Sequence, residues 1–339
     1  MTERLRSAGL RLVELTGSDE VAMRAAWDIR RMTQEHDRPD DPPPSWLSFL
    51  ARPRWPFPGS TEAMRVAYDE DATAVAWLGV YLQTDDNLDV AQVDIEVHPD
   101  HRGRGIGRQV LQLLTDELPP VGRSRMLFEC PMGGPGERFL RAAGARCMVA
   151  DTQRRLDVTR MDVAHHDELL RDATSHASDY DLVTWVGATP TDMLDDVAVL
   201  HARMSTDPPL DDLVLEPEEY DAPKVAARDR MMAAHGKRVY AAAVRHRTSG
   251  TVVGITTLVV TSDVPTFGDQ WETIVLPEHR GHRLGMLLKI ANLQQVLVHE
   301  PQLEVVDTWN ADSNAVMLAV NVEMGFVPVR AGGEWELTA

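Results

Sequence analysis

The 339-residue sequence contains only two cysteines, Cys130 and Cys147, too few for a disulfide scaffold. We expect both to be buried as small hydrophobic side chains in a reducing compartment, so a cytoplasmic location is predicted. The sequence has no run of about 18 apolar residues, and no segment is therefore expected to span a membrane. Residues 1–15 also lack the apolar core of a secretory signal.

Basic residues are scarce as well. The chain has 34 Lys and Arg against 53 Asp and Glu, which gives a formal net charge of −19. Such a chain repels nucleic-acid phosphate and anionic lipid, so we expect neither nucleic acid nor a membrane as partner. It would attract a cationic molecule such as an amine, although acidity can equally serve solubility alone. The adjacent His165 and His166 lack the spacing of metal ligands, so we expect linker surface there and no metal.

Two common nucleotide-binding loops are absent. The sequence has no Gly-Lys-Ser/Thr of a P-loop, and its glycines at 103, 105 and 107 do not follow the G-x-G-x-x-G dinucleotide pattern. Instead, residues 93–97 alternate like a strand, His98-Pro99 closes it, and an amphipathic helix begins near Ile106. Unpaired N–H groups at the start of such a helix favour a bound phosphate or pyrophosphate.

The loop between this strand and this helix, Arg102-Gly-Arg-Gly-Ile-Gly107, resembles the R-x-x-G-x-G acyl-CoA loop of the GCN5-related N-acetyltransferase (GNAT) family. Arg102, Gly105 and Gly107 occupy its three fixed places. The segment from Val97 to Gly107 recurs, displaced by 178 residues, as the segment from Val275 to Gly285. A period of this length suits a domain and is too long for a solenoid repeat.

The resemblance implies two tandem GNAT folds of the α/β (α+β) class, each with a mixed, mostly antiparallel central sheet flanked by helices. We expect domains at residues 1–158 and 181–339, joined by a linker at 159–180. This tandem arrangement is similar to that of mycothiol-synthase-like proteins. A pseudo-dimer within one chain is expected to exist as a monomer or a homodimer.

The resemblance also implies an acyl-CoA co-substrate, which we expect to be acetyl-CoA. In this family a backbone N–H of the motif strand polarises the thioester carbonyl. The second domain also carries the family's Asn-x-x-Ala/Met element, and the first domain lacks it. The expected CoA-binding residues are Ile95, Val97, Arg102, Gly103, Arg104, Gly105, Ile106, Gly107 and Arg108 in the first domain, and Val275, Arg280, Gly281, His282, Arg283, Leu284, Gly285, Asn310 and Asn314 in the second.

Arg283 stands where the first loop has Gly105. A left-handed conformation at that position would cost roughly 1–2 kcal/mol without glycine. The backbone N–H survives the change, and the guanidinium could reach a phosphate. We therefore expect the first domain to bind CoA more readily than the second.

Acyl transfer to an amine needs a base, because an amine with a pKa near about 10.4 must first lose a proton. Asp94 and Glu96 lie two residues apart on the motif strand and face the same way. Glu272 aligns with Asp94 in the repeat, and all three are candidate bases or, alternatively, surface strand residues. The family often places a tyrosine, as proton donor to the thiolate, four residues before a final Gly-Phe. Leu140 and Asn321 stand there, so the thiolate leaves unassisted or accepts a hydrogen bond from Asn321.

We predict a CoA-dependent N-acyltransferase that acetylates a small cationic amine. Two alternatives remain open: a peptide or protein amine as acceptor, or a non-catalytic CoA- or amine-binding protein, since neither domain has the tyrosine. An acidic run lies where the family builds the wall of the acceptor site, although such runs are often only solvated surface. Its members are Asp207, Asp211, Asp212, Glu216, Glu218, Glu219 and Asp221.

Overall fold

The structure is a computed structural model that describes residues 6–7 and 9–338. The chain forms two compact units, which we call unit 1 (Met1–Met148 with Gly333–Ala339) and unit 2 (Val149–Gly332). This division differs from the expected boundary after residue 158, because strand β7 (Arg146–Asp157) begins in unit 1 and ends in unit 2. Strand β13 (Val327–Thr338) begins in unit 2 and ends in unit 1.

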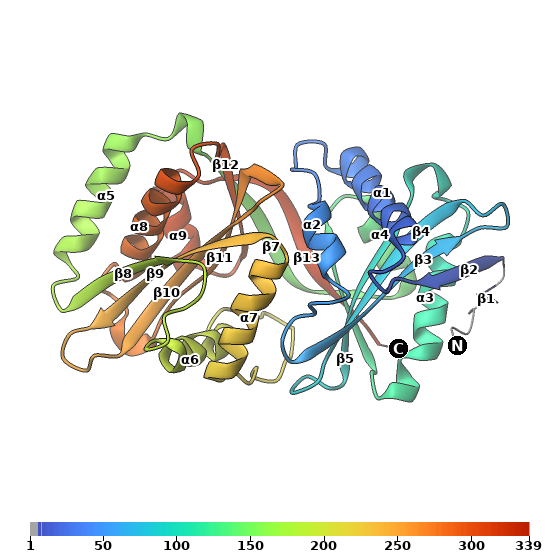
Figure 1. The fold of residues 1–339 in the computed structure, drawn as a ribbon, viewed down its shortest axis with the longest axis horizontal. Coiled ribbons are helices and arrows are strands. Elements are labelled where there is room, and N and C mark those ends of the chain that lie inside the picture. The colour runs from blue at the N-terminus through green and yellow to red at the C-terminus, as the bar shows by residue number, and fades with distance from the viewer. Residues whose placement is uncertain (1–5, 8, 339) are drawn as a thin grey trace. The chain divides into compact units, whose positions relative to one another are not determined.

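Figure 1 labels the helices and strands of both units. The other elements of unit 1 are β1 (Arg6–Ser7), β2 (Leu10–Glu14), α1 (Glu20–Asp37), α2 (Trp46–Ala51), β3 (Ser60–Tyr68), β4 (Ala74–Gln83), β5 (Val90–Val97), α3 (Ile106–Glu117), β6 (Arg125–Pro131) and α4 (Pro135–Ala143). Those of unit 2 are α5 (Val163–Ser175), β8 (Tyr180–Val186), α6 (Leu194–Met204), α7 (Ala222–Ala234), β9 (Lys237–His246), β10 (Val252–Thr261), β11 (Val264–Val275), α8 (Leu284–His299), β12 (Val305–Ala311) and α9 (Ala315–Glu323).

The sheet of unit 1 has the order β1-β2-β3-β4-β5-β6, with the end of β13 next to β6. Neighbours from β1 to β5 are antiparallel, and β5 and β6 are parallel. Because successive strand residues point to opposite faces, Leu78 packs in the cluster that includes α3, and Trp77 packs in the cluster that includes α1 and α2. The end of β13 completes unit 1, since Trp335 is fully buried in the α3 cluster.

The sheet of unit 2 has the order β7-β12-β11-β10-β9-β8. Only β11 and β12 are parallel among these neighbours. Helices α5 and α8 cover one hydrophobic cluster, and α6 and α7 cover another. The tandem arrangement of mixed, mostly antiparallel sheets flanked by helices is confirmed.

The segment at 159–180 folds as part of unit 2 and contains α5, although a linker was expected there. Leu169 and Ala173 of this helix are buried in the core. His165 Nε2 and His166 Nε2 each lie 2.9 Å from a carbonyl oxygen at the end of α9. His166 is therefore buried, and its expected place on a linker surface is wrong.

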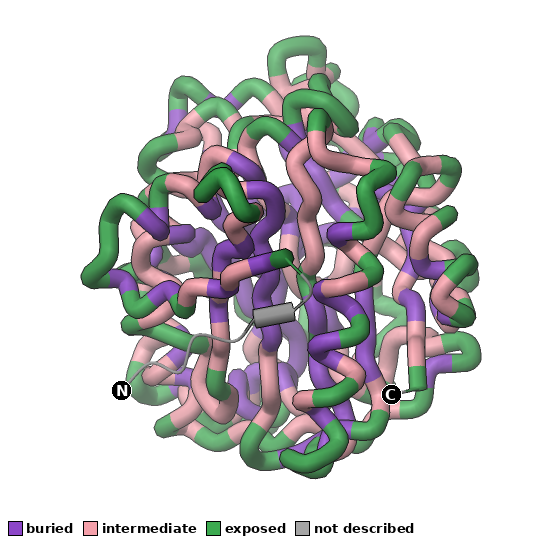
Figure 2. The backbone as a smooth tube through the Cα atoms, turned by 90° about the vertical axis from the view of Figure 1, so that its right-hand side faces the viewer, coloured by how far each residue is buried: buried purple, intermediate pink, exposed green. Residues whose placement is uncertain are grey.

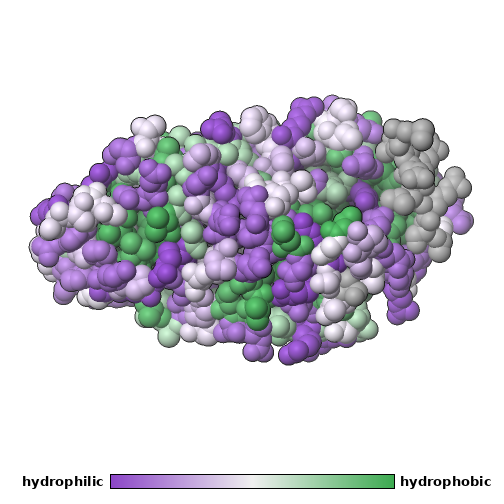
Figure 3. All heavy atoms as spheres, turned by 90° about the horizontal axis from the view of Figure 1, so that it is seen from below, coloured by the Kyte–Doolittle hydropathy of each residue, from purple (hydrophilic) through white to green (hydrophobic). Residues whose placement is uncertain are grey.

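In Figure 2 the buried residues, in purple, lie mainly in the interior of the trace, and the exposed residues, in green, lie mainly in outer loops and turns. The face seen in Figure 3 is mainly hydrophilic, with separate hydrophobic spots. Among the described residues, the helices lack the combination of length and apolar character needed to cross a membrane. Cys130 and Cys147 do not form a disulfide.

Candidate acyl-CoA sites

The same divergence of two parallel strands occurs in each unit. In unit 1, β5 pairs with β6 only over residues 90–92, although β5 continues to residue 97. In unit 2, β11 pairs with β12 over residues 267–269 and continues to residue 275. The end of β5 or β11 keeps its antiparallel neighbour but has no parallel neighbour, and it leads into a glycine-containing loop and a helix. Backbone N–H groups on the open side of the strand and at the start of the helix are therefore available to one extended ligand.

In unit 1 the loop is open above the start of α3. Gly103 and Gly105 have φ of +76° and +82°, and Gly105 caps the helix. A Cβ built on either residue would meet no atom of the described residues within 4 Å. The glycines therefore serve backbone conformation and leave the space above them open. Gly107 differs, because a Cβ there would lie 3.3 Å from Phe139 Cε2. Ile106 is buried beneath the loop, and Arg108 is exposed.

The first arginine of each loop holds the loop in place. Arg102 donates to both carboxylate oxygens of Asp37, at 2.8 and 2.7 Å, and to the carbonyl oxygen of Val97 at 3.1 Å. Burial disfavours the charge on Asp37, but its hydrogen bonds to Arg102 outweigh this effect and lower the pKa. Arg280 repeats the arrangement with Asp207 at 2.6 Å and the Val275 carbonyl at 2.9 Å.

The neighbouring loop residues have different surroundings. Arg104 donates to the Asp100 carbonyl at 2.9 Å. In the second loop, Gly281 and His282 are exposed, Leu284 is buried, and a Cβ on Gly285 would meet nothing within 4 Å.

Arg283 adopts the left-handed conformation that its repeat position predicted, with φ of +52°. Its guanidinium does not extend as a free phosphate ligand, because Nε lies 2.8 Å from Asp172 Oδ2 and Nη2 lies 2.8 Å from Glu323 Oε1. The second loop therefore carries backbone strain that the first loop avoids with Gly105.

Asp94 and Glu96 share one face of β5, as predicted, while Ile95 and Val97 pack toward α3 on the other face. The Asp94 side chain is 47 % exposed and the Glu96 side chain 17 %. Glu96 Oε1 lies 4.0 Å from Arg30 Nε, and Glu96 Oε2 is buried without a hydrogen-bond partner among residues 6–7 and 9–338. Burial raises the pKa of Glu96, an effect that Arg30 only partly offsets.

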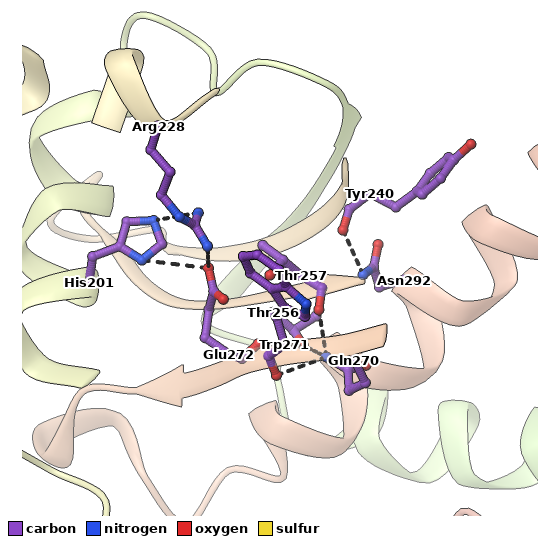
Figure 4. Close-up of polar contacts among 9 residues, drawn as sticks. All are labelled: His201, Arg228, Tyr240, Thr256, Thr257, Gln270, Trp271, Glu272 and Asn292. Carbon is purple, nitrogen blue, oxygen red and sulfur yellow. Dashed lines mark hydrogen bonds and ion pairs between the residues drawn. The ribbon is translucent and has the colours of Figure 1, made fainter. Parts of the chain in front are cut away.

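Glu272 lies in a buried ion pair, shown in Figure 4. Its Oε1 is 2.8 Å from Arg228 Nη2 and 3.5 Å from His201 Nδ1. Burial disfavours the charge, but Arg228 outweighs this effect and the pKa of Glu272 lies below its usual value. Burial also lowers the pKa of His201 to about 4. An ionised carboxylate held by a buried guanidinium is a weak base, so this geometry favours a structural role for Glu272.

Asn321, the candidate hydrogen-bond donor to sulfur, is fully buried in unit 2. Its Oδ1 accepts a hydrogen bond from Lys289 Nζ, and its Nδ2 donates to Asn310 Oδ1 at 2.6 Å. Asn314 accepts from the Met317 N–H at 3.2 Å and caps α9. Lys289 is not among the residues predicted from the sequence, although a single lysine in the apolar segment after the second loop is a visible signal.

Two residues of the acidic run, Asp207 and Asp221, make local structural contacts. Asp207 Oδ1 lies 3.1 Å from Arg203 Nε, and Asp207 Oδ2 binds Arg280. Asp221 caps α7 by accepting from the Lys224 N–H at 2.8 Å. These two carboxylates therefore stabilise the fold of unit 2.

Comparison with known proteins agrees with this geometry. Residues 23–134 match the model of the acetyltransferase (GNAT) family. A tandem GNAT protein from the clavulanic acid biosynthesis pathway, solved without AcCoA, is 27 % identical, with a TM-score of 0.80 and coverage of 97 % of this chain and 98 % of that chain. Residues 23–134 thus match the GNAT family, and the whole chain has the fold of a tandem GNAT protein.

Two further solved structures share the fold of this chain. A GCN5-related N-acetyltransferase from Sphaerobacter thermophilus is 14 % identical, with a TM-score of 0.64 and coverage of 97 % and 95 % of the two chains. Saccharomyces cerevisiae N-myristoyltransferase with bound myristoyl-CoA is 9 % identical, with a TM-score of 0.63 and coverage of 100 % and 81 %. No curated protein matched in sequence. The GNAT family uses acyl-CoA, and the matched domain supports acyl-CoA-dependent N-acyltransferase activity for this chain.

Proposed function

We propose that unit 1 transfers an acetyl group from acetyl-CoA to a small cationic amine. The observation that carries this proposal is the open glycine loop at the start of α3, next to a strand whose partly buried Glu96 has a raised pKa. The loop offers N–H groups to the CoA phosphates. The carboxylate is a better base than an ordinary surface glutamate, because its raised pKa brings it closer to neutral pH.

In this mechanism Glu96 accepts the proton that the acceptor amine loses, directly or through one water. The neutral amine nitrogen bonds to the acyl carbon and gives its second proton to water, the carbon–sulfur bond breaks, and the sulfur leaves as a thiolate. A backbone N–H of Ile95 or Val97 donates to the carbonyl oxygen while negative charge develops there. Leu140 carries no acidic proton, so water protonates the thiolate in unit 1. Arg102 acts indirectly by holding the loop against Asp37.

The acceptor class is inferred from charge. The chain has a formal net charge of −19, and Asp94 is exposed on the same strand face as Glu96. Both features favour a cation over an anion near this face. We further propose a cytoplasmic location, a monomeric or homodimeric state, and a weaker second CoA site at residues 280–285, where Arg283 is strained.

The test is the release of CoA thiol from acetyl-CoA by the full chain, with a panel of small amines and amine-bearing peptides. The proposal predicts release that depends on a small amine and falls about 10²- to 10⁴-fold in Glu96→Gln, the range for loss of a general base. Asp116→Asn, an exposed change on α3, is the matched control and should retain the rate. Release with peptides alone would support the other acceptor class, and acetyl-CoA binding without release would support a binding protein.

A further inference from the structure

Arg30 brings a positive charge to the Glu96 carboxylate without a hydrogen bond to it. On α1 it follows Ala26 and precedes Thr33 by one turn, and both of these residues are buried. The Arg30 side chain therefore leaves the helix beside the face that packs on the sheet. Its Nε lies 4.0 Å from Glu96 Oε1, which is too long for a hydrogen bond. This contact is electrostatic, and it leaves the carboxylate able to accept a proton.

The indole ring of Trp77 holds the guanidinium at this distance. Trp77 is fully buried on β4 and lies directly opposite Glu96 in the pairing of β4 with β5. The central carbon of the Arg30 guanidinium lies 4.9 Å from the centroid of this ring, within the range of a cation–π contact. A ring packed in the core occupies one position. Trp77 therefore fixes the guanidinium beside the carboxylate.

The buried pair of Glu272 and Arg228 shows what a closer guanidinium does. Arg228 Nη2 lies 2.8 Å from Glu272 Oε1, and the pKa of Glu272 is lowered although burial opposes this. The pKa of Glu96 is raised instead, because the effect of burial exceeds that of Arg30. A hydrogen-bonded guanidinium favours the ionised carboxylate more strongly than one at 4.0 Å. The longer contact of Arg30 thus eases the ionisation of Glu96 and preserves its character as a base.

Three further charged side chains act on Glu96. Asp94, on the same face of β5, disfavours its ionisation, whereas Arg38 at the end of α1 and Arg52 on α2 favour it. Arg52 also pairs with carboxylates on β3 and β5, which compensate part of its charge. Of these four neighbours, Arg30 has the largest effect. Loss of its charge would therefore be the largest electrostatic change that one of these neighbours can impose on Glu96.

We propose that Arg30 is the positioning residue of the base: its guanidinium, fixed on Trp77, supplies the positive charge that lets the Glu96 carboxyl group give up its proton and then receive one from the acceptor amine. Arg30 does not touch the substrate in this assignment. Without its charge, Glu96 remains partly buried beside Asp94 and should hold its proton to a higher pH, by about one unit or more. This inference rests on the proposed function, in which Glu96 is the base.

The experiment measures kcat/KM for a small amine between about pH 5 and about pH 9 in the wild type and Arg30→Met. The ratio of the two values cancels the titration of the amine, which both proteins share. The wild type should exceed the variant at least about tenfold at low pH, and the two should converge at high pH, where Glu96 is ionised in both.

Two matched variants separate the charge from the side chain. Arg30→Lys keeps a positive charge and should restore most of the wild-type pH profile. Arg31→Met removes an arginine of the same helix that pairs with Glu35 at 2.6 Å, and it should have the wild-type profile. A shift in Arg31→Met as large as that in Arg30→Met would contradict a specific action on Glu96.

A second readout does not need turnover. The carboxyl carbon resonance of Glu96, identified by its absence in Glu96→Gln, should titrate about one unit higher or more in Arg30→Met. Arg30→Gln serves if Arg30→Met does not fold. An unchanged titration of Glu96 would overturn the inference, as would an equal loss of rate at every pH, which indicates a structural role alone. A shifted titration together with an unchanged rate in Glu96→Gln would instead refute the proposed function.

Discussion

The strained Arg283 gives a prediction about stability that can be worked from the structure. Its φ of +52° costs about 1–2 kcal/mol relative to glycine. Its ion pairs with Asp172 and Glu323 each contribute about 0.2–1 kcal/mol, because the three side chains are 35 %, 44 % and 41 % exposed. Arg283→Gly removes both the strain and the two ion pairs, which largely cancel, so the free energy of unfolding should change by less than about 2 kcal/mol.

Comparison with Arg283→Ala isolates the strain. Alanine also loses the ion pairs but keeps the unfavourable backbone conformation, so it should be less stable than Arg283→Gly by about 1 kcal/mol. Gly105→Arg introduces the strain into unit 1, where no neighbour lies within 4 Å of the new Cβ, and should cost about 1–2 kcal/mol. The assay is urea denaturation followed by circular dichroism. An alanine variant as stable as the glycine variant would refute the assignment of strain to Arg283.

Three further predictions concern buried charges. Because the pKa of Glu96 is raised in the folded state, wild-type stability falls as pH rises from about 4.5 through the folded pKa, and Glu96→Gln should be more stable at neutral pH. The free energy of unfolding at pH 4 and pH 7 tests this. The prediction fails if the variant shows the same difference between the two pH values as the wild type. Lys289 has the opposite effect on the pH dependence of stability, because its folded pKa of about 7 lies below the usual 10.5. The free energy of unfolding should rise between pH 7 and pH 10.5 by at most about 1.4 kcal/mol per pH unit, and Lys289→Met should remove this rise. Glu272→Gln should destabilise by about 3–5 kcal/mol, because Arg228 keeps an uncompensated buried charge; a folded variant of wild-type stability that has lost activity would restore Glu272 as a base.

The repeated motif was enough to predict the tandem fold, because strand alternation, the Pro turn and the helix face are local signals. Strand β5, the start of α3 at Ile106 and the start of α8 at Leu284 lie where the repeat places them. The boundary between units 1 and 2 could not be predicted from local sequence signals. Strands β7 and β13 each belong to both units, and the segment containing α5 reads as a polar connection although its Leu169 is buried.

The backbone conformation of the candidate site was predicted more fully than the contacts of its side chains. The left-handed conformations at Gly105 and Arg283 follow from the motif itself. The partners of charged residues do not, because they come from distant segments: Asp37 binds Arg102 across 65 residues, and Arg228 binds Glu272 across 44. Ion pairs between distant segments cannot be predicted from residue spacing in the sequence. These pairs determine which carboxylate can still accept a proton.

The most direct test of the central claim is calorimetric titration of acetyl-CoA into the wild type, Gly105→Trp and Gly285→Trp. Both tryptophans would enter space that is open within 4 Å of the Cβ, one above each loop. Gly105→Trp should remove the tighter binding event, and Gly285→Trp should leave it unchanged. Undiminished tight binding by Gly105→Trp, or no binding by the wild type, would contradict the assignment of the acyl-CoA site to unit 1.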